Sequence, residues 1–363
     1  MHLSTSNFER KIPAVNWRVI LPTIFVVFIL IIAGWEIFWR SKGYAPTLND
    51  SKYLWAKTRE SIKPDDVVII GSSRGLFDID LKSLATALQV KEVKQLAMTG
   101  SSPTPVLEAL ANDPHFKGII ICDVVPGLFF APAGPPINKP TEWVKNSSNF
   151  SPSDRAALEI NMVLESYLAY LKQDDLSLKE LIKHLDLPNR DNTIVYPKLP
   201  PYFCTMDSNR EAKMTQRVLD DKEFRELIQN RWPILFTPPP FQDNPTPEVI
   251  GQRIEGMIKG KIQFVKGCLE KIQNKGGKII FVGFPSSGPL KELEAKLSPR
   301  VAFWDRMLAE TGAQGIYWED YENLKNFDCP EWSHLSAADS VKFTQEIGPI
   351  IKEKLSKKEE FKK

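Results

Sequence analysis

Two short stretches near opposite ends of the chain carry residue types that can perform nucleophilic chemistry. The first runs from Asp66 to Arg74 and reads Asp-Val-Val-Ile-Ile-Gly-Ser-Ser-Arg. Four β-branched residues indicate a buried strand, and the serines follow where that strand ends. Ligands of open α/β sheets bind beyond the carboxyl ends of the strands, and a serine placed there becomes a nucleophile when a base reaches it. The alternative interpretation is a serine that only caps the next helix.

The second stretch is Asp328-Cys-Pro-Glu-Trp-Ser-His334. It places the carboxylate of Glu331 three residues before the imidazole of His334, a spacing that lets the acid orient the histidine as a general base. The chain has four histidines, and the other three lie in less suggestive settings. The alternative interpretation is a structural loop or helix-cap histidine.

Together these stretches resemble the SGNH (GDSL-like) hydrolase superfamily, whose first block is a strand followed by Gly-x-Ser and whose last block is acid-x-x-His before the final helix. Gly71-Ser72-Ser73 matches the first block and makes Ser73 the nucleophile. Glu331-Trp-Ser-His334 matches the last, with Glu where Asp is usual, and Asp328 is a rival for the acid role. The resemblance covers residues 66 to about 355, but only its two ends are specific.

The resemblance also implies an oxyanion hole. The backbone N–H groups of Ser73 and Gly100 are its predicted donors. The third block of the superfamily supplies a Gly-x-Asn, but this chain has Asp123 near that place, and a carboxylate is a poor donor to an oxyanion. We interpret Asp123 and Arg74 as candidate substrate-binding residues, with pairing to a carboxylate as the alternative role of Arg74.

The Gly-Ser-Ser variant behind one N-terminal apolar helix is similar to the membrane-anchored branch of this superfamily, which includes proteins of alginate O-acetylation and of D-alanyl transfer to teichoic acid. The resemblance implies a serine esterase or O-acyltransferase, an acyl-ester donor, a polysaccharide acceptor and a membrane protein that supplies the acyl group. Water is the alternative acceptor. The alternative function is a non-catalytic, membrane-tethered binding or assembly protein that keeps the fold.

Composition and motif spacing argue against several other classes of function. The 363 residues carry a formal net charge of +2, which gives no electrostatic signature of nucleic-acid binding. The four cysteines show no metal-binding spacing, so neither a metal nor another cofactor is predicted. Cys329 lies beside the acid–His loop without the context of a cysteine nucleophile. The loop after the first predicted strand lacks the three-glycine spacing of a dinucleotide site.

The N-terminal region predicts a membrane anchor. Residues 19–39 are almost continuously apolar and approach the roughly 20 residues that span a bilayer. Trp17, Trp35 and Trp39 stand at its ends, where aromatic belts form. The alternative is a cleaved signal peptide, but no Ala-x-Ala-like site follows. The balance of basic residues slightly favours a cytoplasmic segment 1–18 and an extracytoplasmic domain.

The rest of the pattern predicts one α/β domain with a three-layer, flavodoxin-like, doubly wound parallel sheet. A linker over 40–63 precedes the domain at 64–356, and a charged tail follows at 357–363. Proline clusters over 128–245 exclude regular central strands and indicate a large insertion, either a lid or acceptor-binding element or a surface excursion. The predicted strands are 67–70, 94–98, 118–122, 278–283 and 315–318, and the main predicted helices are 104 onward, 154–172, 246–275, 302–311 and 336–355.

Overall fold

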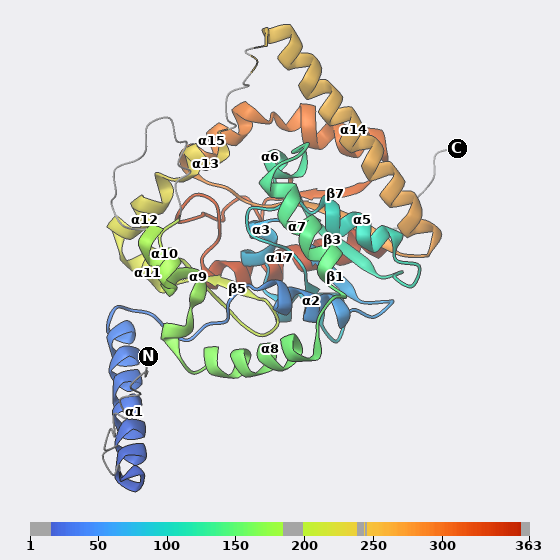
Figure 1. Cartoon of the computed structure of the whole chain (residues 1–363). Helices are drawn as coiled ribbons and strands as arrows, with labels where there is room; N and C mark the ends of the chain where they lie inside the picture. The colour runs from blue at the N-terminus through green and yellow to red at the C-terminus, as the bar shows by residue number, and fades with distance from the viewer. Residues whose placement is uncertain (1–15, 184–198, 238–242, 244, 357–363) are drawn as a thin grey trace, which may run out of the picture.

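The computed structural model describes residues 16–183, 199–237, 243 and 245–356. It shows a mixed α/β domain built on a five-stranded parallel sheet, with one apolar helix projecting from it (Figure 1). The strand order is β2-β1-β3-β6-β7, so the chain starts in the middle, moves to one edge and then returns to build the other side. The strands are β1 Val67–Ile70, β2 Val93–Gln95, β3 Ile119–Asp123, β6 Lys278–Gly283 and β7 Gln314–Tyr317.

The sheet is buried on both faces, as the unbroken apolar runs of its strands require. Val67 and Ile69 of β1 face one core cluster, whereas Val68 and Ile70 face the other. The first cluster is covered by α4 (Leu81–Leu88), α15 (Gly288–Leu297) and α17 (Ala337–Ser356). The second is covered by α2 (Lys52–Glu60), α5 (Thr104–Asn112), α14 (Pro247–Asn274) and α16 (Arg306–Thr311).

All five predicted strands are present, with ends that differ by up to three residues. The helix predicted over 246–275 is confirmed as α14, with Thr246 as its N-cap. The helix predicted over 154–172 is shorter, because α8 (Pro152–Glu165) stops and a 3₁₀ turn η1 (Ala169–Leu171) follows. The carboxylate of Glu36 binds the N–H groups of Ala169 and Tyr170, which a continuous helix would have used internally. The helix predicted over 302–311 begins with a π-helical turn, η2 (Val301–Asp305).

The described part of the chain between β3 and α14 contains helices and a separate two-stranded sheet, and it adds no strand to the central sheet. Its parts are α6 (Pro126–Phe129), α7 (Pro135–Asn146), α8, η1, α9 (Gln173–Leu176), α10 (Leu178–Lys183), the antiparallel pair β4 (Cys204–Met206) and β5 (Ala212–Met214), α11 (Gln216–Asp220), α12 (Lys222–Gln229) and α13 (Trp232–Phe236). This is the region predicted as an insertion, and we call it the insertion below.

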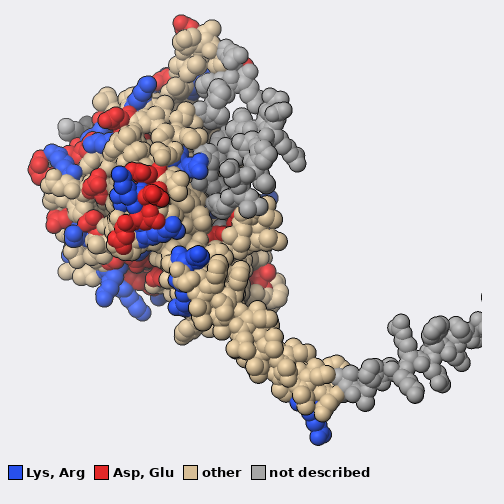
Figure 2. Space-filling model, turned by 90° about the vertical axis from the view of Figure 1, so that its left-hand side faces the viewer, with Lys and Arg blue, Asp and Glu red and all other residues tan. Residues whose placement is uncertain are grey.

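The N-terminal helix α1 (Trp17–Ser41) is long and apolar enough to span a membrane, and none of its residues is buried. Its 25 residues correspond to about 37 Å at 1.5 Å per residue. Figure 2 shows it as a rod that is uncharged over most of its length and leaves a domain whose surface is densely charged. The lack of buried residues distinguishes α1 from the core helix of a soluble domain. Residues 1–15 of the predicted cytoplasmic segment 1–18 lie outside the described residues, as does the predicted tail 357–363.

A buried arginine joins the insertion to the edge of the sheet. The guanidinium of Arg210 donates to the carbonyl oxygens of Gln95 and Ala97 at 2.7 and 3.0 Å and to Asp50 Oδ1 at 2.7 Å. The side chain of Arg210 is completely buried. Because β2 is an edge strand, these carbonyl groups have no neighbouring strand to pair with, and Arg210 satisfies them.

We expect Arg210→Ala to lower the free energy of unfolding by about 3 to 5 kcal/mol, because it leaves two carbonyls and a carboxylate without their buried partner. The matched control is Arg155→Ala, which breaks an equally close pair with Glu60 on the surface and should change stability little. Urea unfolding of the full chain in detergent micelles measures both. Equal effects from the two variants would contradict the role of Arg210.

Candidate active site

The turn after β1 is built around the carboxylate of Asp123 at the end of β3. Asp123 Oδ2 accepts hydrogen bonds from Ser72 N at 2.8 Å, Ser72 Oγ at 2.6 Å and Gly75 N at 3.1 Å. A Cβ atom on Gly71 would lie 2.3 Å from Asp123 Cβ, and one on Gly75 would lie 2.9 Å from it. Glycine is therefore required at both positions for β1 and the next helix to approach Asp123.

This arrangement separates the roles of the two serines. Ser72 is 1% exposed, donates its hydroxyl to Asp123 and caps α3 (Ser73–Phe77) by accepting from Arg74 N. Ser73 is the one residue between Gly71 and Ile79 that is not buried, and among the described residues its hydroxyl has no hydrogen-bond partner. The cap that the alternative interpretation requires is thus Ser72, and Ser73 remains free to react.

The carboxylate of Glu331 binds the backbone and the imidazole of the turn that runs from Glu331 to His334. Glu331 Oε1 lies 2.7 Å from His334 Nδ1 and accepts from His334 N at 2.6 Å. Glu331 Oε2 accepts from Ser333 N and from the indole N–H of Trp232. Trp332 has a φ of +80°, which is unusual for a bulky residue and shows how tightly the turn is wound. Both Glu331 and His334 are buried.

Glu331, and not Asp328, is the acid that contacts His334. Asp328 is exposed, and the described residues show no hydrogen bond from it to the imidazole. Because a carboxylate accepts and does not donate, its bond to Nδ1 assigns the proton to Nδ1 in the neutral ring. His334 Nε2 then presents its lone pair, and it is buried without a hydrogen-bond partner among the described residues. A lone pair on Nε2 is what a general base needs.

Helix α3 is bound directly to this turn. Arg74 Nε donates to Ser333 O at 3.2 Å, and Asp78 Oδ1 accepts from Leu335 N at 2.9 Å. The Phe77 ring stacks on the imidazole of His334, with 4.7 Å between centroids. Ser73 and Phe77 are four residues apart in α3, a spacing that places two side chains on the same face of a helix. The imidazole therefore contacts α3 through Phe77, and the described contacts include no hydrogen bond between Ser73 and His334.

Aromatic side chains from the insertion complete the surroundings of His334. The ring centroids of Phe203 and Trp232 lie 5.7 and 5.6 Å from that of the imidazole. Trp232 also donates to Glu331 O at 2.6 Å. The sequence analysis missed Phe77, Phe203 and Trp232. The spacing of Phe77 from Ser73 was the one available signal, because nothing in the local sequence links the insertion to His334.

The other predicted site residues have different surroundings. Arg74 is 3% exposed, and its guanidinium pairs with Glu294 at 2.6 Å, which fits the pairing interpretation. Asp123 is buried beneath the turn, where its Oδ2 binds the turn and its Oδ1 has no hydrogen-bond partner among the described residues. Gly100 is exposed with a φ of +63°, two residues after Met98, whose N–H binds Gly71 O. Gly100 thus lies near the end of β1, where the oxyanion donor was predicted.

No protein-family model matches this chain, and no curated protein matches it. The site is therefore interpreted from its own geometry. Cys329 is buried beside the acid–His turn, where burial raises the pKa of its thiol. A thiol held in its neutral form is a weak nucleophile, which leaves Ser73 as the better candidate.

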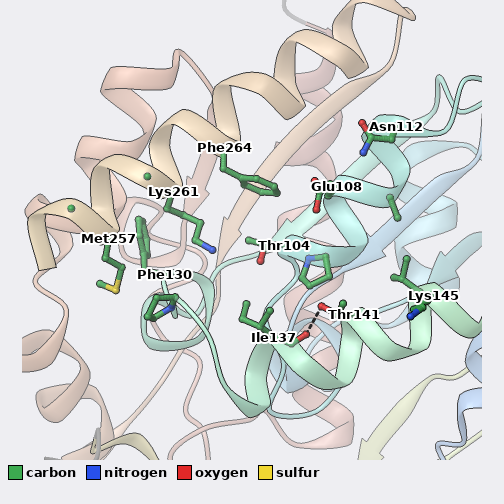
Figure 3. A pocket seen from close by; sticks show the side chains of 16 residues that line it. Thr104, Glu108, Asn112, Phe130, Ile137, Thr141, Lys145, Met257, Lys261 and Phe264 are labelled. Atoms are coloured by element: carbon green, nitrogen blue, oxygen red, sulfur yellow. Dashed lines mark hydrogen bonds between the residues drawn. The ribbon is translucent and has the colours of Figure 1, made fainter. Parts of the chain in front are cut away.

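A groove of about 610 Å³ lies elsewhere, between α5, α7 and α14 (Figure 3). Phe264 and Lys261 of α14 face Thr104 and Glu108 of α5 across it. Its lining is mostly apolar and contains none of the predicted catalytic residues. The helices that form it cover the sheet face opposite α17. The groove is thus separate from the Ser73–His334 site.

The carboxyl of Asp78 gives the site a measurable pH dependence. Burial raises its pKa well above the usual value, against the opposing hydrogen bond from Leu335 N and the charge of Arg74. The folded protein therefore holds a proton on Asp78 that the unfolded chain releases near pH 4. Its contribution to stability is fully present below that pH and is lost as the pH rises through the folded-state pKa.

We expect Asp78→Asn to flatten the decline in unfolding free energy between pH 4 and pH 7, because the amide mimics the protonated acid and cannot ionise. Urea unfolding at a series of pH values compares the slopes of the two proteins. A variant that loses stability with pH as steeply as the parent would show that Asp78 ionises normally in the folded state.

Proposed function

We propose that this protein is a membrane-anchored serine esterase or O-acyltransferase with an SGNH-like, doubly wound three-layer fold. The observation that carries the proposal is the state of His334: Glu331 holds Nδ1, Nε2 has no partner among the described residues, and the ring stacks on Phe77, four residues after Ser73 in α3. The strand order, which is 2-1-3-4-5 for the five strands of the sheet, is also that of flavodoxin-like folds.

In the proposed reaction, Ser73 Oγ attacks the carbonyl carbon of an acyl ester while its proton passes to His334 Nε2. The N–H groups of Ser73 and Gly100 stabilise the oxyanion. Collapse of this intermediate breaks the bond to the leaving alkoxide, which takes the proton from Nε2 and leaves an acyl-Ser73. Water or a sugar hydroxyl then gives its proton to Nε2 and attacks the acyl group, releasing an acid or a new ester together with free Ser73.

The burial of the site fits transfer of the acyl group to a specific acceptor. His334 Nε2 is enclosed by Phe203 and Trp232 of the insertion, so substrate entry requires these side chains to move. Excluding water before the acceptor binds would favour transfer over hydrolysis. The choice of a cell-surface polysaccharide as acceptor, of a membrane protein as acyl donor and of an extracytoplasmic location rests on the resemblance to the membrane-anchored branch.

The anchor is supported by contacts between α1 and the domain. Glu36 binds the N–H groups of η1, and the ring of Trp39 packs on that of Tyr44 with centroids 5.1 Å apart. Removal of α1 as a signal peptide would break these contacts. They therefore favour a helix that stays attached and holds the domain close to the membrane.

We expect turnover of p-nitrophenyl acetate by the full chain in detergent to fall at least about 10³-fold in Ser73→Ala and in His334→Ala, because nucleophile and base act as a unit. Glu331→Gln should reduce turnover by roughly 10² to 10⁴-fold. The matched control is Asp328→Asn, which changes the exposed rival acid and should leave turnover unchanged. Unchanged turnover in Ser73→Ala would rule out the proposed nucleophile.

The second candidate is a non-catalytic membrane-tethered binding or assembly protein. Two observations favour it. His334 Nε2 is enclosed, and Asp123, which stands where the superfamily has an asparagine, is hydrogen-bonded to the turn after β1. Under this candidate no ester is turned over, and Phe203→Ala, which opens the enclosure without removing a donor to Glu331, does not produce activity. Turnover that rises in Phe203→Ala and disappears when Ser73→Ala is added would exclude it.

A further inference from the structure

Helix α8 exposes an apolar stripe on the outer surface of the domain. Ile160, Val163 and Leu164 are 60%, 59% and 43% exposed, and Tyr167, just after the helix, is 72% exposed. Together with the exposed Ala156 they recur every three or four residues and so lie on one face. We call these five residues the α8 stripe. A contiguous apolar stripe on the surface of a soluble domain marks a contact with something else.

The stripe is not the side by which α8 packs on the domain. Leu158 and Met162 make that contact with the core, and the carboxylate of Glu165 is buried against Asn49 N at 2.9 Å. The charged side chains of α8 are also directed to the domain: Arg155 pairs with Glu60, and Glu159 pairs with Lys57. Arg155 and Glu159 therefore lie between the domain-facing side of the helix and the stripe, and no charged side chain lies within the stripe itself.

The position of α8 relative to α1 identifies what the stripe faces. The segment that follows α8 binds the last turns of α1, through Glu36 to the N–H groups of η1 and through Arg40 to Tyr167 O at 2.9 Å. In Figure 1, α8 lies across the end of the domain from which α1 projects, and its axis crosses the direction of α1. The outer face of α8 therefore points in the direction in which α1 leaves the domain.

We propose that the α8 stripe lies in the interface of the lipid bilayer that α1 crosses, and that it holds the domain against the membrane surface. A helix parallel to the membrane plane with an apolar face is the geometry of interfacial binding. The contacts of Glu36 and Arg40 place this helix beside the carboxyl end of α1, where Trp35 and Trp39 mark the expected headgroup level. The proposal rests on the membrane anchor of the proposed function.

The test is quenching of site-specific fluorophores by the bilayer. The full chain is reconstituted into phosphatidylcholine vesicles that contain a nitroxide-labelled lipid, in a Cys204→Ser background because the other three native cysteines are buried. The label is attached to Ile160→Cys in the stripe, to Gln263→Cys on the exposed surface of α14 as the matched control, and to Ile24→Cys within α1. In Figure 1, α14 lies at the opposite end of the domain from α1.

We expect quenching at position 160 to exceed that at position 263 several-fold, together with strong quenching at position 24. Equal quenching at 160 and 263 with strong quenching at 24 would overturn the stripe proposal and leave the anchor in place. Weak quenching at 24 would overturn the anchor itself. A label at 160 that is protected from aqueous iodide but not quenched by the lipid would also overturn the proposal, because a protein partner or a second copy would then cover the stripe.

Discussion

The site depends on one carboxylate that is held by its own turn. Glu331 accepts hydrogen bonds from the backbone N–H groups of Ser333 and His334, from the imidazole Nδ1 and from the indole of Trp232. These donors compensate a buried carboxylate, which would otherwise be costly. The same contacts fix the position and tautomer of His334, so that Nε2 is left for the reaction. The insertion takes part through Trp232, which links the outer layer of the domain to the acid.

A second buried carboxylate, Asp123, has the corresponding role on the other side of the site. It binds the turn after β1 and needs glycine at positions 71 and 75, and through Ser72 it determines where Ser73 begins α3. Arg74 and Asp78 then bind α3 to the backbone of the acid–His turn. Two chain segments about 260 residues apart are thereby held together by hydrogen bonds between side chains of one and the backbone of the other.

The sequence predicted the three central strands β1, β3 and β6 well because each is an apolar run with a glycine or a polar residue at or just after its carboxyl end, as in Val67–Ile70 and Lys278–Gly283. It also predicted the pairing of Glu331 with His334, since their spacing is local. It could not predict that Asp123 would be used within the protein, because that depends on β1 and β3 being neighbours in the sheet. The sequence also could not predict that Phe203 and Trp232 enclose His334, since this depends on how the insertion packs against the acid–His turn. The end of α8 depended on Glu36, more than a hundred residues earlier in the chain.

The central claim is that Ser73 is activated by His334, and covalent labelling tests it most directly. The full chain is treated with a fluorophosphonate, digested, and the modified peptide is identified by mass spectrometry. The account predicts one adduct on Ser73 that is absent in the His334→Ala and Glu331→Gln variants and present in Asp328→Asn. An adduct on Ser72 or another residue, or folded protein that stays unmodified even when Phe203→Ala opens the enclosure, would contradict it.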